Sequence, residues 1–216
     1  MTEQILPDTA YRITSHEILA LLAFAPGPGT ALTRRVLALA ELPDDHDLVR
    51  AGLGTLNVRD SVSIEGEQVR LHGPAGYLAE VFSTSTLWFD VTRVGPDAVA
   101  PAYIVESPAG RVALFLRALS EYVCLPMNEN AGPLDMVEAT VNDAVAAVRQ
   151  PGSGLVTSRR YDGGAEPSVA NIQVSEDGRL QLASAPLDAT GQLTVRDLHQ
   201  SEQPGSVVRS LLSVPA

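Results

Sequence analysis

The sequence predicts an α+β protein with a central antiparallel β-sheet, helices packed on that sheet, and a helical, winged-helix-like N-terminal part. Two observations support this prediction. Apolar residues recur at helical spacing through much of the first 85 residues, whereas the middle of the chain holds short segments of two-residue alternation separated by Gly and Pro. The 216 residues are 45% hydrophobic and 19% charged, a balance typical of a globular protein with a sizeable core.

Three helices are expected first. The segment from Thr14 to Glu17 has the pattern of a capping box, and it precedes a nearly all-apolar helix that the Pro-Gly-Pro-Gly segment ends. Thr30 caps a second, amphipathic helix, and the acidic residues after Pro43 begin a third. The first two of these helices are expected at residues 17–25 and 30–42.

A β-hairpin and a fourth helix follow. Residues 58–64 and 68–71 alternate in polarity on either side of a Glu-Gly-Glu turn, and Pro74 suits the first turn of a helix that ends near Phe82. This order of elements is the outline of a winged helix, which often binds DNA. A winged-helix-type transcriptional regulator that binds DNA through residues 1–85 is therefore the alternative function.

The charges of this part argue against DNA binding. Residues 48–74 carry three Arg and three acidic side chains, and the tip of the expected wing holds Glu65 and Glu67, where phosphate contacts need Arg or Lys. The whole chain has a net charge of −11 and a pI of about 4.7, so its average field repels nucleic acids and anionic membranes. We therefore expect no nucleic-acid and no membrane partner.

The remainder of the chain is richer in β-like segments. These segments, at 87–94, 102–106, 111–117 and 121–125, predict an antiparallel meander, and a helix is expected at 133–149. A Gly-, Ser- and Arg-rich stretch then predicts a flexible loop or linker, followed by a second hairpin and two amphipathic segments near 194–200 and 204–212. The expected parts of one compact domain of two halves are 1–85 (helical), 86–149 (sheet plus helix), 150–168 (loop or linker) and 169–216 (hairpin and helices).

No motif for catalysis, metal binding or cofactor binding is recognisable. The four His residues are scattered, and the cluster from Asp44 to Asp47 is explained as an acidic helix N-terminus. The single cysteine, Cys124, lies in an apolar run, where a buried, inert thiol is the ordinary case. The N-terminus lacks the pattern of a signal peptide, and no apolar run reaches about 18 residues. We expect a cytoplasmic, non-catalytic protein without cofactor or metal.

A protein-binding surface is predicted near the middle of the chain. Trp88 and Asp90 share one face of their segment, and Arg111, Phe115 and Arg117 share one face of theirs. If helices cover only the other side of the sheet, these side chains lie on an open face, and such a mixture of aromatic residues and Arg is typical of protein–protein interfaces. The alternative is that the C-terminal helices cover this face and that both aromatic residues belong to the core.

Five segments in this order resemble the EspG family, the cytosolic chaperones of actinobacterial type VII secretion. The segments are SHEILALLAF, RAGLGTLNVRDSVSIEGEQVRLHGPAGYLAEVF, TLWFDV, GRVALFLR and VANIQVSEDGRLQL. The resemblance implies a helical part followed by an antiparallel sheet and a second, related half. It also implies binding to the helical hairpin tip of a PE–PPE-type pair, which keeps that pair soluble before export. No binding residue of the family matches a motif here, so none is carried over.

The sequence therefore favours a non-catalytic, protein-binding module, a chaperone or adaptor for secretion substrates of the PE/PPE kind. The DNA-binding regulator and an enzyme with an unrecognised site are the competing classes.

Overall fold

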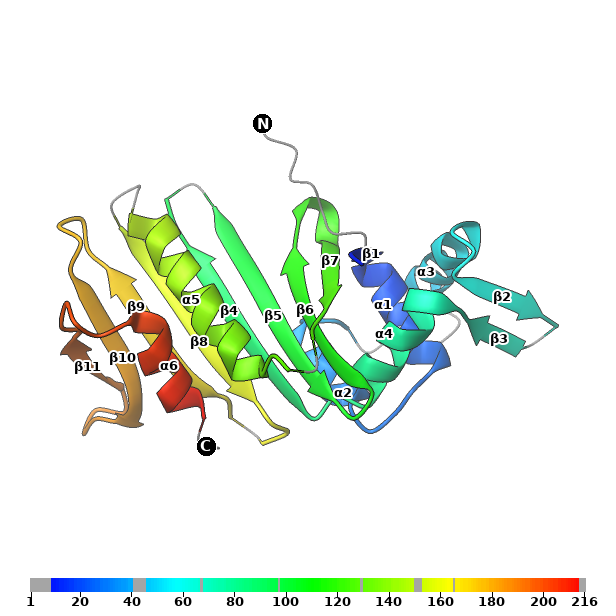
Figure 1. Ribbon diagram of the computed structural model, residues 1–216. Helices are drawn as coiled ribbons and strands as arrows, with labels where there is room; N and C mark the ends of the chain where they lie inside the picture. The colour runs from blue at the N-terminus through cyan, green and yellow to red at the C-terminus, as the bar shows by residue number, and fades with distance from the viewer. Residues whose placement is uncertain are drawn as a thin grey trace. The chain divides into compact units, whose positions relative to one another are not determined.

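The computed structural model describes residues 9–40, 46–66, 68–96, 98–128, 130–149, 153–164 and 166–213. Within these ranges the chain forms six α-helices, one short 3-10 helix and eleven β-strands that pair in antiparallel fashion, which confirms the predicted α+β class (Figure 1). The chain divides into two compact units. The first comprises Met1–Thr86 and Val105–Asn128, and the second comprises Leu87–Ile104 and Glu129–Ala216.

The helices of the first unit follow the predicted order. They are α1 (Ser15–Phe24), α2 (Thr30–Val36), α3 (Asp47–Val58) and α4 (Gly73–Ser83). The predicted capping box is confirmed, because the Thr14 hydroxyl accepts the Glu17 N–H at 3.2 Å and the Glu17 carboxylate accepts the Thr14 N–H at 2.8 Å. The predicted start of the third helix at Pro43 lies outside the described residues, and within them α3 begins at Asp47 with His46 as its cap.

Close contact between α1 and α3 depends on a glycine. A Cβ atom on Gly52 would lie 2.0 Å from the backbone oxygen of His16, so the two helices touch through their backbones at this point. The buried Glu17 carboxylate forms an ion pair with Arg59 at 3.0 Å, and the guanidinium of Arg59 lies 4.8 Å from the centre of the Tyr11 ring. These contacts join the segment around Tyr11, α1 and the end of α3.

The strands of the first unit form a small antiparallel arrangement beside these helices. They are β1 (Tyr11–Thr14), β6 (Gly110–Leu116), β7 (Glu121–Pro126) and the last residues of β5 (Val99–Ser107), in the order β1-β7-β6-β5. One face buries Ile13, Leu114 and Cys124. The predicted hairpin is also present as β2 (Val62–Glu65) and β3 (Gln68–Leu71), with Ile64 opposite Val69.

The second unit contains the longer strands. Its strand order is β5-β4-β8-β9-β10-β11, with β4 (Leu87–Val94), β8 (Gly154–Tyr161), β9 (Ser168–Val174), β10 (Leu180–Leu187) and β11 (Leu193–Asp197). Helices α5 (Pro133–Arg149) and α6 (Pro204–Leu212) lie over one face of β8 and β9, as Figure 1 shows. That face buries Val156, Ile172 and Leu182 as the core of the unit.

Two sequence-based expectations for the second unit are wrong. Strand β8 occupies residues 154–161 of the stretch 150–168 that was expected to be a flexible loop, because its backbone pairs with β4 on one side and β9 on the other. Its small residues suit a crowded position: Ser158 is buried, and a Cβ atom on Gly154 would lie 2.5 Å from the Val94 oxygen. The amphipathic segment near 194–200 contains strand β11, and only the second such segment is helical.

Candidate functional site

The residues of the predicted protein-binding surface fall into both units. Trp88 and Asp90 belong to β4 in the second unit, whereas Arg111 and Phe115 belong to β6 in the first and Arg117 follows that strand. The two groups have different environments.

The expectation that Trp88 and Asp90 lie on an open face is wrong. Trp88 is fully buried and Asp90 is only 6% exposed. Phe89 and Val91, which alternate with them onto the other face of β4, are buried as well, so both faces of the strand are covered along residues 88–91. The Asp90 carboxylate accepts hydrogen bonds from Arg159 at 2.9 Å and from the Thr92 hydroxyl at 2.6 Å, so its charge is paired within the folded chain.

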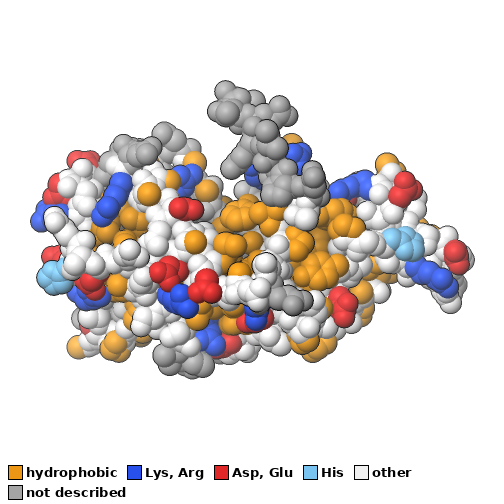
Figure 2. All heavy atoms as spheres, viewed as in Figure 1, with side chains coloured by type: hydrophobic (Ala, Val, Ile, Leu, Met, Phe, Trp, Pro, Cys, Tyr) orange, Lys and Arg blue, Asp and Glu red, His pale blue; other side chains and the backbone are white. Residues whose placement is uncertain are grey.

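The three predicted residues near β6 are more accessible. Arg111 forms an ion pair with Glu106 at 2.7 Å, Phe115 is half-buried opposite Val123, and Arg117 is exposed just after the strand. In Figure 2, apolar side chains gather over the part of the first unit where Figure 1 places β6, β7, α1 and α4. Contiguous apolar surface of this kind often marks an interaction site. Binding through Arg111, Phe115 and Arg117 stays a prediction.

The turn between β6 and β7 presents a side chain that the sequence did not identify. This turn is the short 3-10 helix η1 (Ala118–Ser120), in which Leu119 is 97% exposed and has φ 60° and ψ 31°. Ser120 has φ 56°, and the Glu121 N–H donates a hydrogen bond to the Ala118 oxygen. Sequence patterns indicated only that the two strands are separated here. The sequence does contain one signal: the connection between the two strands is short and lacks the Gly, Asn and Asp residues that tight hairpin turns favour.

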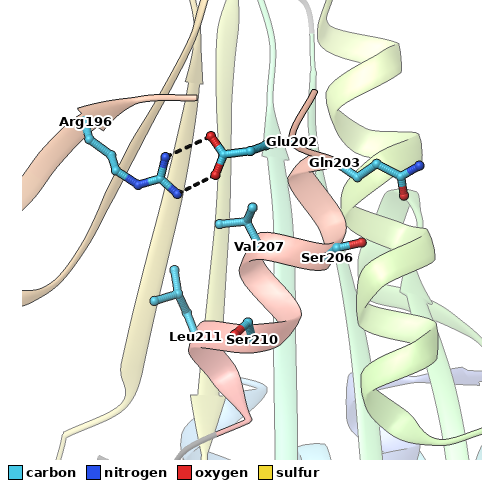
Figure 3. A pocket seen from close by; sticks show the side chains of 7 residues that line it. All are labelled: Arg196, Glu202, Gln203, Ser206, Val207, Ser210 and Leu211. Carbon is cyan, nitrogen blue, oxygen red and sulfur yellow. Dashed lines mark hydrogen bonds and ion pairs between the residues drawn. The ribbon is translucent and has the colours of Figure 1, made fainter. Parts of the chain in front are cut away.

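A pocket of about 460 Å³ lies beside α6 in the second unit (Figure 3). Val207 and Leu211 point toward the side of Arg196, whereas Gln203 and Ser206 point toward the opposite side of the helix. The carboxylate of Glu202 accepts hydrogen bonds from both terminal nitrogens of Arg196, at 2.9 and 3.0 Å, and from the His199 N–H at 2.8 Å. The Arg196 hydrogen bonds, and next the His199 N–H, lower the pKa of Glu202 to about 2.

Polar groups of this pocket are paired with one another or with neighbouring side chains. Its charged groups neutralise each other, and the Ser206 hydroxyl already donates a hydrogen bond to Glu138 at 2.5 Å. A serine nucleophile needs an adjacent base that accepts its proton, and no His is among the residues that line the pocket.

Burial raises the pKa of three groups of the first unit, Cys124, Tyr122 and Tyr77. Burial raises the pKa of the Cys124 thiol to about 12, so the thiolate that a nucleophile or a metal ligand requires is disfavoured. Burial also raises the pKa of Tyr122 and of Tyr77, whose hydroxyl donates to the Arg111 oxygen at 3.4 Å. Within the described part of the chain, no group of three or more His, Cys, Asp or Glu side chains has a geometry that could hold a metal ion.

The described helices are all too short or too polar to cross a membrane. Residues 1–8, on which the expected absence of a signal peptide depends, lie outside the described part of the chain.

Comparison with known proteins gives a fold relationship. The chain matches no protein-family model and no curated protein sequence. It is similar to a solved structure described as the Mycobacterium tuberculosis type VII secretion system chaperone EspG5 in complex with a PE25–PPE41 dimer. The TM-score is 0.51 at 10% sequence identity, and the similarity covers 95% of this chain and 95% of EspG5. The chain has an EspG-like fold.

The similarity to EspG5 extends over both units of the chain. A match over 95% of both chains includes most of the helices and strands of each unit. At 10% identity the side chains of the EspG5 surface are not retained as a set, so the similarity concerns the backbone arrangement. The PE25–PPE41 dimer is the partner of EspG5 in that structure.

Proposed function

We propose that this chain is a non-catalytic chaperone that binds a helical protein pair of the PE–PPE kind. The single observation that carries the proposal is the EspG-like fold over nearly the whole length of the chain, because the EspG5 chaperone with that fold is bound to a PE25–PPE41 dimer. Fold alone does not determine function, so the surface has to suit the same role.

The surface of the first unit supports this role. A chaperone of this kind needs accessible apolar area to cover apolar side chains of its client, with polar groups around it that fix the orientation. The apolar side chains gathered over β6, β7, α1 and α4 provide such an area, and Phe115 and Arg117 lie on or beside one of these strands. We assign partner binding to this surface and to Arg111, Phe115 and Arg117.

The chemistry of the pocket beside α6 and of Cys124 is consistent with a binding role. The accessible pocket beside α6 contains an ion pair that is internally neutralised, and the only cysteine is buried. No observation favours the DNA-binding alternative, since the hairpin ends in Glu65 and the chain carries a net charge of −11.

Mixing experiments test the proposal directly. The purified chain is combined with a panel of purified PE–PPE dimers that includes PE25–PPE41, and the mixtures are analysed by size-exclusion chromatography with light scattering. We expect one stable complex of the chain with at least one dimer. EspG5 with PE25–PPE41 is the positive control. If the chain elutes alone with every dimer while the control complex forms, the proposal is wrong.

A charge reversal tests the assigned surface. Arg117→Glu is expected to raise the dissociation constant of the complex at least about 10-fold, in the range of charged residues within an interface. Arg179→Glu, at an exposed Arg in the turn between β9 and β10, is the matched control and is expected to change the dissociation constant by less than about twofold. Equal effects of the two substitutions on the dissociation constant would contradict the assignment of partner binding to the β6 surface.

A further inference from the structure

The turn between β6 and β7 has a backbone conformation that its residues do not favour. Leu119 and Ser120 both have positive φ angles, and the Glu121 N–H closes the turn on the Ala118 oxygen, as in a type I′ turn. Such turns are dominated by Gly, Asn and Asp, because a larger L-residue in this region suffers a clash between its Cβ atom and the backbone. Leu is an unfavourable residue at this position.

The folded chain gains little from the Leu119 side chain in return. The side chain is 97% exposed, so it contributes almost no apolar burial to offset the backbone strain. An isolated exposed Leu needs no explanation in a protein, but an exposed Leu in a left-handed conformation combines two unfavourable features. A contact with another molecule would bury the side chain, and it would explain both the exposure of Leu119 and its left-handed conformation.

The turn is also held in place. The Ser15 hydroxyl, in the first turn of α1, donates a hydrogen bond to the Ser120 oxygen at 3.4 Å. The Arg117 N–H donates to the Glu121 oxygen at 2.7 Å and continues the hairpin up to the turn. A side chain on a supported turn loses less conformational freedom on binding than one on a free loop, which favours its use as an anchor.

The charges beside the turn indicate which kind of partner surface would be complementary to it. Arg117 precedes the turn and is exposed, and Arg12 on β1 is 61% exposed and lies 3.9 Å from Glu121. Two Arg and one Glu make this edge of the first unit locally basic, although the chain as a whole has a net charge of −11. A complementary surface has carboxylates around an apolar centre.

We propose that Leu119 is an apolar anchor that inserts into a carboxylate-rimmed apolar pocket on the PE–PPE-type partner. The inference rests on the proposed function, and it adds a contact in which the chaperone supplies the inserted side chain and the partner supplies the pocket. Arg117 and Arg12 face the carboxylates of the rim and orient the turn.

The substitution Leu119→Asn separates an anchor from a structural residue. Asn tolerates the left-handed conformation, so the variant is expected to melt about 2–4 °C above the wild type. Loss of the anchor is expected to raise the dissociation constant at least about 10-fold, measured by calorimetry with a PE–PPE dimer that binds the wild type. Leu187→Asn, at a 59% exposed Leu in β10 with the same change of side chain, is the control and is expected to leave affinity within about twofold.

The possible results distinguish failure of the anchor from failure of the proposed function. Unchanged affinity of Leu119→Asn, with the wild type still binding, overturns the anchor and leaves the proposed function intact. A lower melting temperature of this variant also overturns it, because Leu119 then stabilises the fold. Failure of the wild type to bind any dimer of the panel overturns both proposals. Arg117→Gln tests the carboxylates proposed around the partner's pocket, and it should weaken the salt dependence of binding. An unchanged salt dependence would show that Arg117 does not face carboxylates of the partner.

Discussion

At the scale of single residues, Glu17 shows how one carboxylate can stabilise several elements. It is 1% exposed, and it accepts the Thr14 N–H, the Thr14 hydroxyl and the guanidinium of Arg59. Burial of a charge is unfavourable unless the charge is paired and hydrogen-bonded, and here each oxygen has partners. The capping-box pattern predicted the contact with Thr14 from local sequence, but Arg59 is 42 residues away and no local pattern indicates it.

Removal of Glu17 should therefore affect two interactions at once. Glu17→Ala is expected to lower the free energy of unfolding by about 2–3 kcal/mol, because the variant loses a helix cap and leaves Arg59 without its carboxylate. Urea denaturation of Glu17→Ala, Arg59→Ala and the double variant measures this. The double variant should be at least about 0.5 kcal/mol more stable than the sum of the single losses predicts. Strict additivity would show that the ion pair contributes nothing.

At the scale of elements, the sequence predicted those whose signals are local. Helix α5 has the expected bounds, since its Val residues recur at helical spacing, and the hairpin of β2 and β3 follows its alternation. Strand β8 was missed because its composition resembles a linker and its pairing partners are distant in sequence. The alternation in β4 correctly separated two faces, but it could not indicate that both are covered at Trp88.

The two glycines of α3 offer a matched pair of substitutions. A Cβ atom on Gly54 meets nothing within 4 Å, so Gly54→Ala should raise the free energy of unfolding by about 0.5–1 kcal/mol through better helix propensity. Gly52→Ala places its methyl group against the backbone of α1 and should lower stability by about 1–3 kcal/mol. Thermal unfolding of both variants checks the signs. A stabilising Gly52→Ala would mean that α1 and α3 are not in backbone contact.

The pairing of Glu202 with Arg196 should appear as a pH dependence of stability. The pKa of Glu202 is lowered in the folded state from its ordinary value of 4.5 to about 2, so the pairing contributes stability above pH 4.5 that is lost as the pH falls toward 2. Unfolding of the wild type and of Glu202→Gln is compared between pH 6 and pH 2. The difference in stability between them should shrink across this interval. A constant difference would show that the ion pair is not formed in solution.

At the scale of the whole molecule, the order of elements and the α+β class could be read from the sequence, and the EspG-like fold agrees with the family that the sequence resembles. The accessible residues of a candidate site could not be read in the same way. Phe115 and Trp88 have equivalent positions in their alternation patterns, yet one is half-buried and the other fully buried. The difference arises from neighbours that are assembled only in the folded chain.

The division into units predicts the behaviour of a fragment. A fragment of residues 1–86 contains all four helices of the first unit but lacks β6 and β7, so β1 has no strand to pair with and α4 loses its contact with β6. We expect it to lack cooperative thermal unfolding, measured by circular dichroism, whereas the full chain unfolds cooperatively. Cooperative unfolding of the fragment would mean that the helices alone form a stable core.

Strand β5 has a consequence for synthesis of the protein. Its residues up to Ile104 belong to the second unit and those from Val105 onward to the first. A ribosome therefore releases β4 and most of β5 before either unit has its full set of strands, and the first unit is complete only once Asn128 has emerged. A protein proposed to shield apolar surfaces of its clients thus exposes its own apolar strands during translation, and it depends on a returning segment to cover them.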